Sequence, residues 1–172
     1  ALPISLSHFG EKCLRLQLQL TYTDGTTQTV CTDGTWQTKP SAITYNSVHG
    51  GEIYNANLET PLWATTRDNS EGWQNVKTIE GHKAEMSPHP APPDRIVETM
   101  KPISLTRRED GAWIVDFGKE ISGWIHFRDL KGTKGDTLKV DYMSESVQGN
   151  MRYVMNGSGN EEYAPRFTWF AF

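Results

Sequence analysis

Apolar and polar side chains alternate along much of this chain, and that alternation limits the fold more than any other feature. The clearest stretch has an apolar residue at every second position from 14 to 22, with polar residues between them. A period of two places successive side chains on opposite faces of an extended strand. No stretch shows three turns of helical periodicity, so the pattern predicts an all-β protein.

Turn-forming residues divide the alternating stretches into short strands. Asp24-Gly25 is typical of a hairpin turn and would join the strand at 14–22 to one at 26–31. Further strands are predicted at 53–58, 96–105, 113–118, 123–127, 137–142 and 166–172. Many short strands with Gly- and Asp-rich turns favour an antiparallel β-sandwich of jelly-roll type.

The segment SPHPAPPD at 87–94 contains four prolines and excludes both a helix and a central strand. It is either a linker between two domains or a long loop inside one sandwich. The loop is favoured because each flanking part has fewer than 100 residues and few strands. We therefore expect a single jelly-roll domain over residues 1–172 with a Pro-rich internal loop at 87–94. The aromatic stretch at 166–172 resembles an interrupted strand, which suggests a segment of a larger multidomain protein.

Composition argues against several classes of partner. The formal net charge is -4 and no basic patch is visible, so nucleic acid is not an expected partner. No apolar run approaches about 18 residues, so no membrane span is expected. Cys13 and Cys31 flank the first hairpin at positions too far apart to be bridged, which predicts two free thiols. No signal peptide is visible, and the localisation is left open.

The stretch GEIYNANL at 51–58 is the main candidate for a binding site. Strand periodicity places Ile53, Asn55 and Asn57 on one face. The opposite, inward face would carry Glu52, Tyr54, Ala56 and Leu58. An amide offers one acceptor and two donors, which suits a sugar hydroxyl. The alternative is an edge strand whose asparagines meet water or cap a bulge.

An inward Glu52 needs hydrogen-bond donors or a cation. It either accepts hydrogen bonds from loop amides or helps to hold calcium, for which oxygen ligands are suited. Asp116 and Glu145 are further candidates near strand ends. No spacing selects a facing pair of carboxylates, and no zinc, nucleophile-elbow or phosphate-loop motif occurs, so no catalytic residue is predicted.

The six tryptophans have two possible roles, as core residues or as stacking surfaces for sugar rings. Trp63 and Trp73 lie near loops, so stacking stays open for them. A core position is expected for those inside predicted strands: Trp36, Trp113, Trp124 and Trp169.

Eight short motifs follow one another in a fixed order: YTDG at 22–25, TDGTW at 32–36, GEIYNAN at 51–57, GW at 72–73, DFG at 116–118, GW at 123–124, Glu145, and PRFT at 165–168. This order resembles the non-catalytic β-sandwich region of bacterial α-L-rhamnosidases, glycoside hydrolase family 78, over about residues 13 to 172. The resemblance implies a jelly-roll domain placed before an (α/α)6 barrel that holds the catalytic carboxylates and is absent here. Some family members' sandwich domains are carbohydrate-binding modules of family 67, which bind terminal L-rhamnose with the help of calcium.

The resemblance turns GEIYNAN into a predicted sugar site. Its carbohydrate-binding residues would be Glu52, Tyr54, Asn55, Asn57 and Trp73, with Asn55 as a calcium ligand. Asn55 stands where the family has Asp, which makes it a weaker ligand. Asn57 stands where the family usually has Arg, which removes a guanidinium that could hold a carboxylate such as Glu52.

Three functions follow as hypotheses. The first is an accessory carbohydrate-binding domain of an α-L-rhamnosidase-like hydrolase, with a rhamnose-containing glycan and the catalytic barrel of the same protein as partners. The alternative is a purely structural sandwich that packs against that barrel and has no ligand. A third is an enzyme in its own right that uses Glu52, Asp116 or Glu145.

Overall fold

A computed structural model describes residues 13–47, 50–65, 71–81, 85, 87, 90–143, 149–166 and 170–172. Strands and one 3-10 helix make up its regular structure, and no described helix is long and apolar enough to span a membrane. The elements are β1 (Gln17–Thr21), β2 (Thr27–Cys31), β3 (Gln37–Thr38), β4 (Ile43–Ser47), β5 (Gly51–Asn55), η1 (Ala56–Leu58), β6 (Gln74–Asn75), β7 (Ser104–Arg107), β8 (Trp113–Asp116), β9 (Ser122–Gly123), β10 (Phe127–Leu130), β11 (Thr137–Asp141), β12 (Asn150–Val154), β13 (Glu161–Tyr163) and β14 (Phe170–Ala171). The prediction of an all-β chain is confirmed.

The chain divides into two compact units. The first comprises residues 1–39 and 70–89, and the second comprises residues 40–69 and 90–172. The prediction of one jelly-roll domain over 1–172 stays a prediction. The described residues from 90 to 94 contain no strand, as expected for the end of the Pro-rich segment.

The first unit contains the predicted hairpin. β1 and β2 pair antiparallel around Asp24-Gly25, and Cys31 lies opposite Gln17. Asp24 Oδ1 accepts hydrogen bonds from the backbone N–H and the hydroxyl of Thr26, and Gly25 adopts a φ of 83°, so both turn residues have a structural task. Cys13 and Cys31 are free thiols, as predicted.

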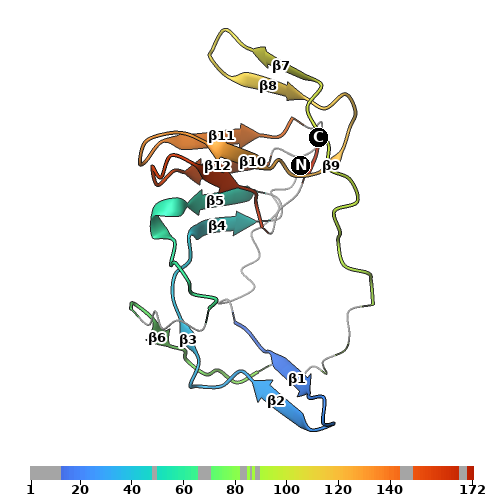
Figure 1. Ribbon diagram of the computed structural model, residues 1–172, viewed down its shortest axis with the longest axis vertical. Coiled ribbons are helices and arrows are strands. Elements are labelled where there is room, and N and C mark those ends of the chain that lie inside the picture. Colours follow the sequence, from blue (N-terminus) through green and yellow to red (C-terminus); the bar gives the residue numbers. More distant parts are fainter. Residues whose placement is uncertain are drawn as a thin grey trace, which may run out of the picture. The chain divides into compact units, whose positions relative to one another are not determined.

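The second unit is built on a four-stranded sheet in the order β11-β12-β5-β4 (Figure 1). The outer pairs, β11 with β12 and β4 with β5, are antiparallel. The central pair, β12 with β5, is parallel, so the prediction of a purely antiparallel sandwich is wrong at this position. The parallel register aligns Glu52 with Met151 and Tyr54 with Tyr153.

The core lies on one face of this sheet. Tyr54 and Tyr153 stack with ring centroids 5.7 Å apart, and Tyr163 of β13 packs on Tyr153 at 4.7 Å. The β10–β13 pair therefore contributes to a second layer over the buried face of the sheet. Further along, Tyr142 packs against Phe170 of β14 at 5.0 Å. Aromatic rings thus pack between the layers at both places.

Several predicted strands differ in extent from the observed ones. The strand predicted at 53–58 ends at Asn55, where η1 begins, and the one predicted at 96–105 begins only at Ser104. The strand predicted at 123–127 is divided between β9 and β10. Pro102 accounts for the late start of β7 and Gly123 for the end of β9, since neither residue favours a strand interior. At Asn55 the strand ends because this residue caps η1.

Two tryptophans lie outside the core that was predicted for them. Trp113 is 60% exposed and Trp124 is also exposed, whereas Trp36 is partly buried. Trp169 lies outside the described residues. The buried core of the described residues instead consists of tyrosines, methionines, alanines and a phenylalanine: Ala42, Tyr54, Ala56, Tyr142, Met151, Tyr153, Met155, Tyr163 and Phe170.

Candidate functional site

The GEIYNAN stretch begins with a glycine that the backbone requires. Gly51 has a φ of 93°, and a Cβ added there would lie 1.6 Å from the carbonyl oxygen of Asn150. Only glycine leaves room for β5 to approach β12 this closely. The motif therefore starts at the contact between the two central strands.

Glu52 is completely buried, with 0% of its surface exposed. Its Oε1 accepts a hydrogen bond from the Tyr163 hydroxyl at 3.1 Å, and its Oε2 accepts one from the backbone N–H of Arg166 at 3.2 Å. Asn46 Nδ2 donates to the same Oε2 at 3.4 Å. The predicted hydrogen bonding is thus present, from one backbone N–H, one side-chain amide and one hydroxyl. A role of Glu52 in holding calcium stays a prediction.

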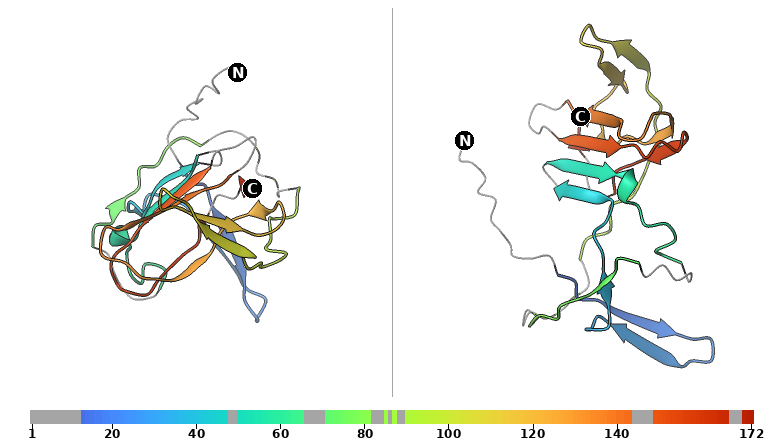
Figure 2. Two further views of the ribbon diagram at one scale, coloured as in Figure 1. Left: turned by 90° about the horizontal axis from the view of Figure 1, so that it is seen from above. Right: turned by 90° about the vertical axis from the view of Figure 1, so that its left-hand side faces the viewer.

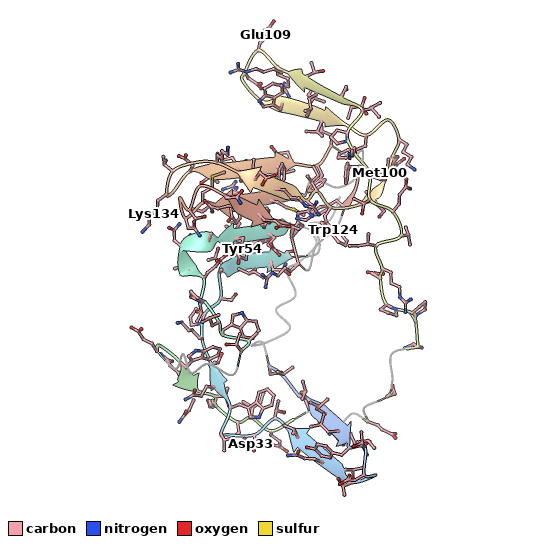
Figure 3. All side chains as sticks on the ribbon, viewed as in Figure 1. Asp33, Tyr54, Met100, Glu109, Trp124 and Lys134 are labelled. Atoms are coloured by element: carbon pink, nitrogen blue, oxygen red, sulfur yellow. The ribbon has the colours of Figure 1, made fainter. Side chains whose placement is uncertain are left out.

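Three tyrosines next to Glu52 each donate to a different carboxylate. The Tyr54 hydroxyl donates to Glu59 at 2.7 Å, and the Tyr153 hydroxyl donates to Glu161 at 2.8 Å. The Tyr163 hydroxyl donates to Glu52 at 3.1 Å. We call these six residues the tyrosine–glutamate cluster. Figure 3 shows Tyr54 on the sheet.

The environment keeps these tyrosines protonated. Burial, together with the hydrogen-bonded carboxylate of Glu59, raises the pKa of Tyr54 to about 12. Burial raises the pKa values of Tyr153 and Tyr163 as well, again reinforced by their carboxylate partners. At neutral pH all three hydroxyls are therefore permanent donors.

Asn55 and Asn57 hold each other in place. Asn55 is the last residue of β5 and caps η1: its Oδ1 accepts hydrogen bonds from the backbone N–H of Asn57 at 3.1 Å and from Asn57 Nδ2 at 3.0 Å. Asn57 Nδ2 also donates to the carbonyl oxygen of Met155 at 3.0 Å. Figure 2 shows η1 at the end of β5.

This asparagine pair, Asn55 and Asn57, corrects part of the sequence interpretation. The two residues do not repeat along one strand face, because Asn57 lies on η1. Within the described part of the chain, Asn55 Nδ2 and Asn57 Oδ1 have no hydrogen-bond partner in the protein. One donor group and one acceptor on partly exposed side chains are therefore available to solvent or to a ligand.

The donor set around Asn55 does not fit a calcium ion. The Oδ1 that would coordinate the ion already accepts two hydrogen bonds from Asn57. Among the residues that the structure describes, no group of three or more His, Cys, Asp or Glu side chains is placed to hold a metal. Calcium stays an expectation of the family resemblance.

Three further residues were singled out in the sequence: Trp73, Asp116 and Glu145. Trp73 belongs to the first unit and is partly buried, so its membership of one site with Asn55 stays a prediction. Asp116 Oδ1 accepts the backbone N–H of Gly118 at 2.7 Å and so stabilises a turn. Glu145 lies outside the described residues.

Sequence reasoning missed a second buried carboxylate, Glu161. It accepts the backbone N–H groups of Asn156 and Gly157, each at 2.9 Å, as well as the Tyr153 hydroxyl. Burial alone would raise the pKa of Glu161, but these hydrogen bonds outweigh it and lower the pKa below its ordinary value of 4.5. The sequence did contain a feature that could have indicated this residue: the Gly- and Asn-rich turn NGSGN at 156–160 stands directly before it and offers backbone N–H donors.

We expect Glu161 to make stability sensitive to acid. A carboxyl group with a lower pKa in the folded protein stabilises the fold above its unfolded pKa, and that contribution disappears as pH falls through the folded pKa. The free energy of unfolding should therefore decrease as pH drops below 4.5. Glu161→Gln should flatten this decrease and cost about 1.5 kcal/mol at neutral pH. Urea unfolding across the acid range measures both, with the exposed Glu109→Gln as control; an unchanged acid slope in Glu161→Gln would contradict the assignment.

Two known families match the chain in succession. Residues 5–98 match the alpha-L-rhamnosidase N-terminal domain, and residues 106–172 match the bacterial alpha-L-rhamnosidase concanavalin-like domain. The chain belongs to the α-L-rhamnosidase family. These two regions are its non-catalytic N-terminal and concanavalin-like parts, as the order of short motifs predicted. The concanavalin-like description also indicates a β-sandwich, in agreement with the two layers of the second unit.

Individual α-L-rhamnosidases are similar along most of the chain. A curated α-L-rhamnosidase of Formosa agariphila is 26% identical over 182 residues, which cover 95% of this chain and 19% of that protein. The solved α-L-rhamnosidase structure from Dictyoglumus thermophilum is 28% identical, with a TM-score of 0.80 over 92% of this chain and 19% of that one. The native Aspergillus terreus enzyme is 26% identical with a TM-score of 0.79, over 91% of this chain and 19% of that one. The chain thus spans about a fifth of the length of these relatives.

Proposed function

We propose that this chain is an accessory carbohydrate-binding part of an α-L-rhamnosidase-like hydrolase, of jelly-roll type, that binds a terminal L-rhamnose or a rhamnose-containing glycan at the asparagine pair. The observation that carries the proposal is the geometry of Asn55 and Asn57. Their shared hydrogen bonds fix both amides and leave one donor group and one acceptor without a partner among the residues that the structure describes. The catalytic barrel of the same protein would be its structural partner.

The chemistry of the sugar suits this pair. A rhamnose hydroxyl both donates and accepts, so it can meet Asn55 Nδ2 and Asn57 Oδ1 at once. Amides that are already held in place lose little conformational entropy on binding. The exposed Leu58 on the same helix offers apolar surface suited to the methyl group of a 6-deoxy sugar. Glu52 and Tyr54 are buried, so their role would be to support β5 beneath the pair.

A structure of the Streptomyces avermitilis α-L-rhamnosidase complexed with L-rhamnose shares this fold, with a TM-score of 0.80 and 24% identity. At that identity it supports the fold alone. The proposal therefore depends on the amide geometry of this chain and needs a direct binding measurement.

Isothermal titration calorimetry with L-rhamnose tests the proposal, first with calcium and then with a chelator. We expect weak binding that Asn55→Ala and Asn57→Ala each reduce at least tenfold, or about 1.4 kcal/mol. Asp110→Ala is a matched control, because Asp110 also accepts a backbone N–H two residues ahead in an exposed turn. No heat at millimolar sugar in either condition, with the near-UV circular dichroism of a folded protein, would refute sugar binding.

The structural alternative has its own support. Glu52 and Tyr54, two of the predicted sugar contacts, are buried. The two apolar side chains of β1, Leu18 and Leu20, are exposed. Exposed apolar surface is typical of a domain that packs against another. Under this alternative, the chain would show no response to rhamnose. Turnover of a rhamnosyl substrate by this chain alone would instead support an enzyme in its own right.

A further inference from the structure

The four-stranded sheet takes two strands from each of the two family-matched segments. β4 and β5 lie within residues 5–98, and β11 and β12 lie within residues 106–172. We propose that the second unit folds only from strands of both segments, so that each segment is the binding partner that the other requires, joined along the parallel β5–β12 pair. They remain associated when the backbone between them is cut. The inference is independent of any ligand.

The backbone contact is continuous along both strands. Five residues of each strand pair in register, from Gly51 with Asn150 to Asn55 with Val154. Gly51 fits this contact so closely that a Cβ would overlap the Asn150 carbonyl oxygen. Without β12, the inner edge of β5 would present unpaired N–H and C=O groups, which is unfavourable for any sheet edge that the fold buries.

Polar side chains reinforce the same contact. Glu52, from the first segment, receives two of its three hydrogen bonds from the second segment, through Tyr163 and Arg166. Asn57, also from the first segment, donates a hydrogen bond to the carbonyl oxygen of Met155 in the second segment. A carboxylate that is fully buried in the assembled sheet thus depends on donors from both segments.

Aromatic packing crosses the contact as well. Tyr54 of the first segment lies 5.7 Å from Tyr153 and 5.8 Å from Tyr163 of the second, measured between ring centroids. The Arg166 guanidinium lies over the Tyr54 ring at 5.9 Å. Tyr54 is thus an aromatic side chain that the first segment contributes to the core. Most of the other core residues belong to the second segment.

The connection between the segments can be cut without touching this sheet. Val97 is 95% exposed, and Glu98 beside it is exposed and lies outside any strand. A protease recognition sequence inserted between Val97 and Glu98 allows cleavage of the folded, full chain. Size-exclusion chromatography in native buffer should then show one peak that contains both fragments. Separation should require urea.

A glycine pair provides the matched variants. Gly51 and Gly135 have nearly the same φ, 93° and 94°, so alanine strains both backbones alike. A Cβ at Gly135 meets nothing within 4 Å, whereas at Gly51 it collides with Asn150. After cleavage, Gly51→Ala should weaken association at least tenfold relative to Gly135→Ala.

The refolding of separated fragments makes the outcome decisive even if Gly51→Ala fails to fold. The cleaved wild-type fragments are separated in urea and diluted either together or apart. Joint dilution should restore the near-UV circular dichroism of the intact chain, and separate dilution should not. Two folded fragments that part in native buffer, or fragments that regain this signal alone, would overturn the proposal. Equal association of the two glycine variants would do the same.

Discussion

Glu52→Ala should lower the free energy of unfolding by about 4 kcal/mol, the largest effect that we expect from any single substitution. The change removes the acceptor for the Tyr163 hydroxyl, the Arg166 N–H and the Asn46 amide, all of which face a fully buried position. A buried donor without a partner costs about 1 to 3 kcal/mol, and the missing side chain also leaves a cavity.

Urea unfolding followed by near-UV circular dichroism measures this change, because the tyrosines that report the signal surround Glu52. Glu98→Ala is the control: its carboxylate is exposed and pairs with Lys119 at 3.3 Å on the surface. Such a pair contributes less than about 1 kcal/mol. A loss for Glu52→Ala no larger than that of the control would mean that its hydrogen bonds do not stabilise the sheet.

Met151→Ala should cost about 3 kcal/mol, through loss of buried apolar surface and formation of a cavity. Met151 is 1% exposed and lies on β12 between Val140 of β11 and Glu52 of β5. Its Sδ also contacts the Tyr142 hydroxyl at 3.2 Å. Truncation at this position removes packing from the centre of the four-stranded sheet.

Met143→Ala provides the comparison for Met151→Ala, since the same atoms are removed from a side chain that is 75% exposed. The control should change the free energy of unfolding by less than about 0.5 kcal/mol. Thermal or urea unfolding of both variants gives the difference. Similar losses in the two variants would place Met151 outside the core.

Local patterns in the sequence predicted part of this fold. The Asp24-Gly25 turn and the regular alternation in β1 and β11 are local, and both were found where expected. β12 was missed because its five residues carry only two apolar positions of a period-two pattern, Met151 and Tyr153. Its parallel pairing with β5 is set by contacts between distant residues, which no local pattern contains.

At the candidate site, too, local patterns in the sequence predicted some features, and contacts between distant residues determined the others. Periodicity correctly predicted that Glu52 and Tyr54 face inward, but Leu58, predicted on the same face, is 49% exposed. Periodicity could not show that the strand ends at Asn55, since a polar residue that continues a strand and one that caps a helix look alike in a short segment. Two donors to Glu52, Tyr163 and Arg166, lie more than 100 residues away in the sequence, so their identity required the folded structure.

The parallel β5–β12 pair also has a consequence for biosynthesis. Asn150 follows its partner Gly51 by about a hundred residues, which a ribosome adds in about 5 to 20 s at rates of about 5 to 20 residues per second. During that interval β4 and β5 can form their hairpin, but the edge of β5 has no native neighbour. Slow translation between the two strands therefore prolongs exposure of that edge to chaperones and to wrong pairing, and synonymous codon choice over residues 56–149 becomes a determinant of yield.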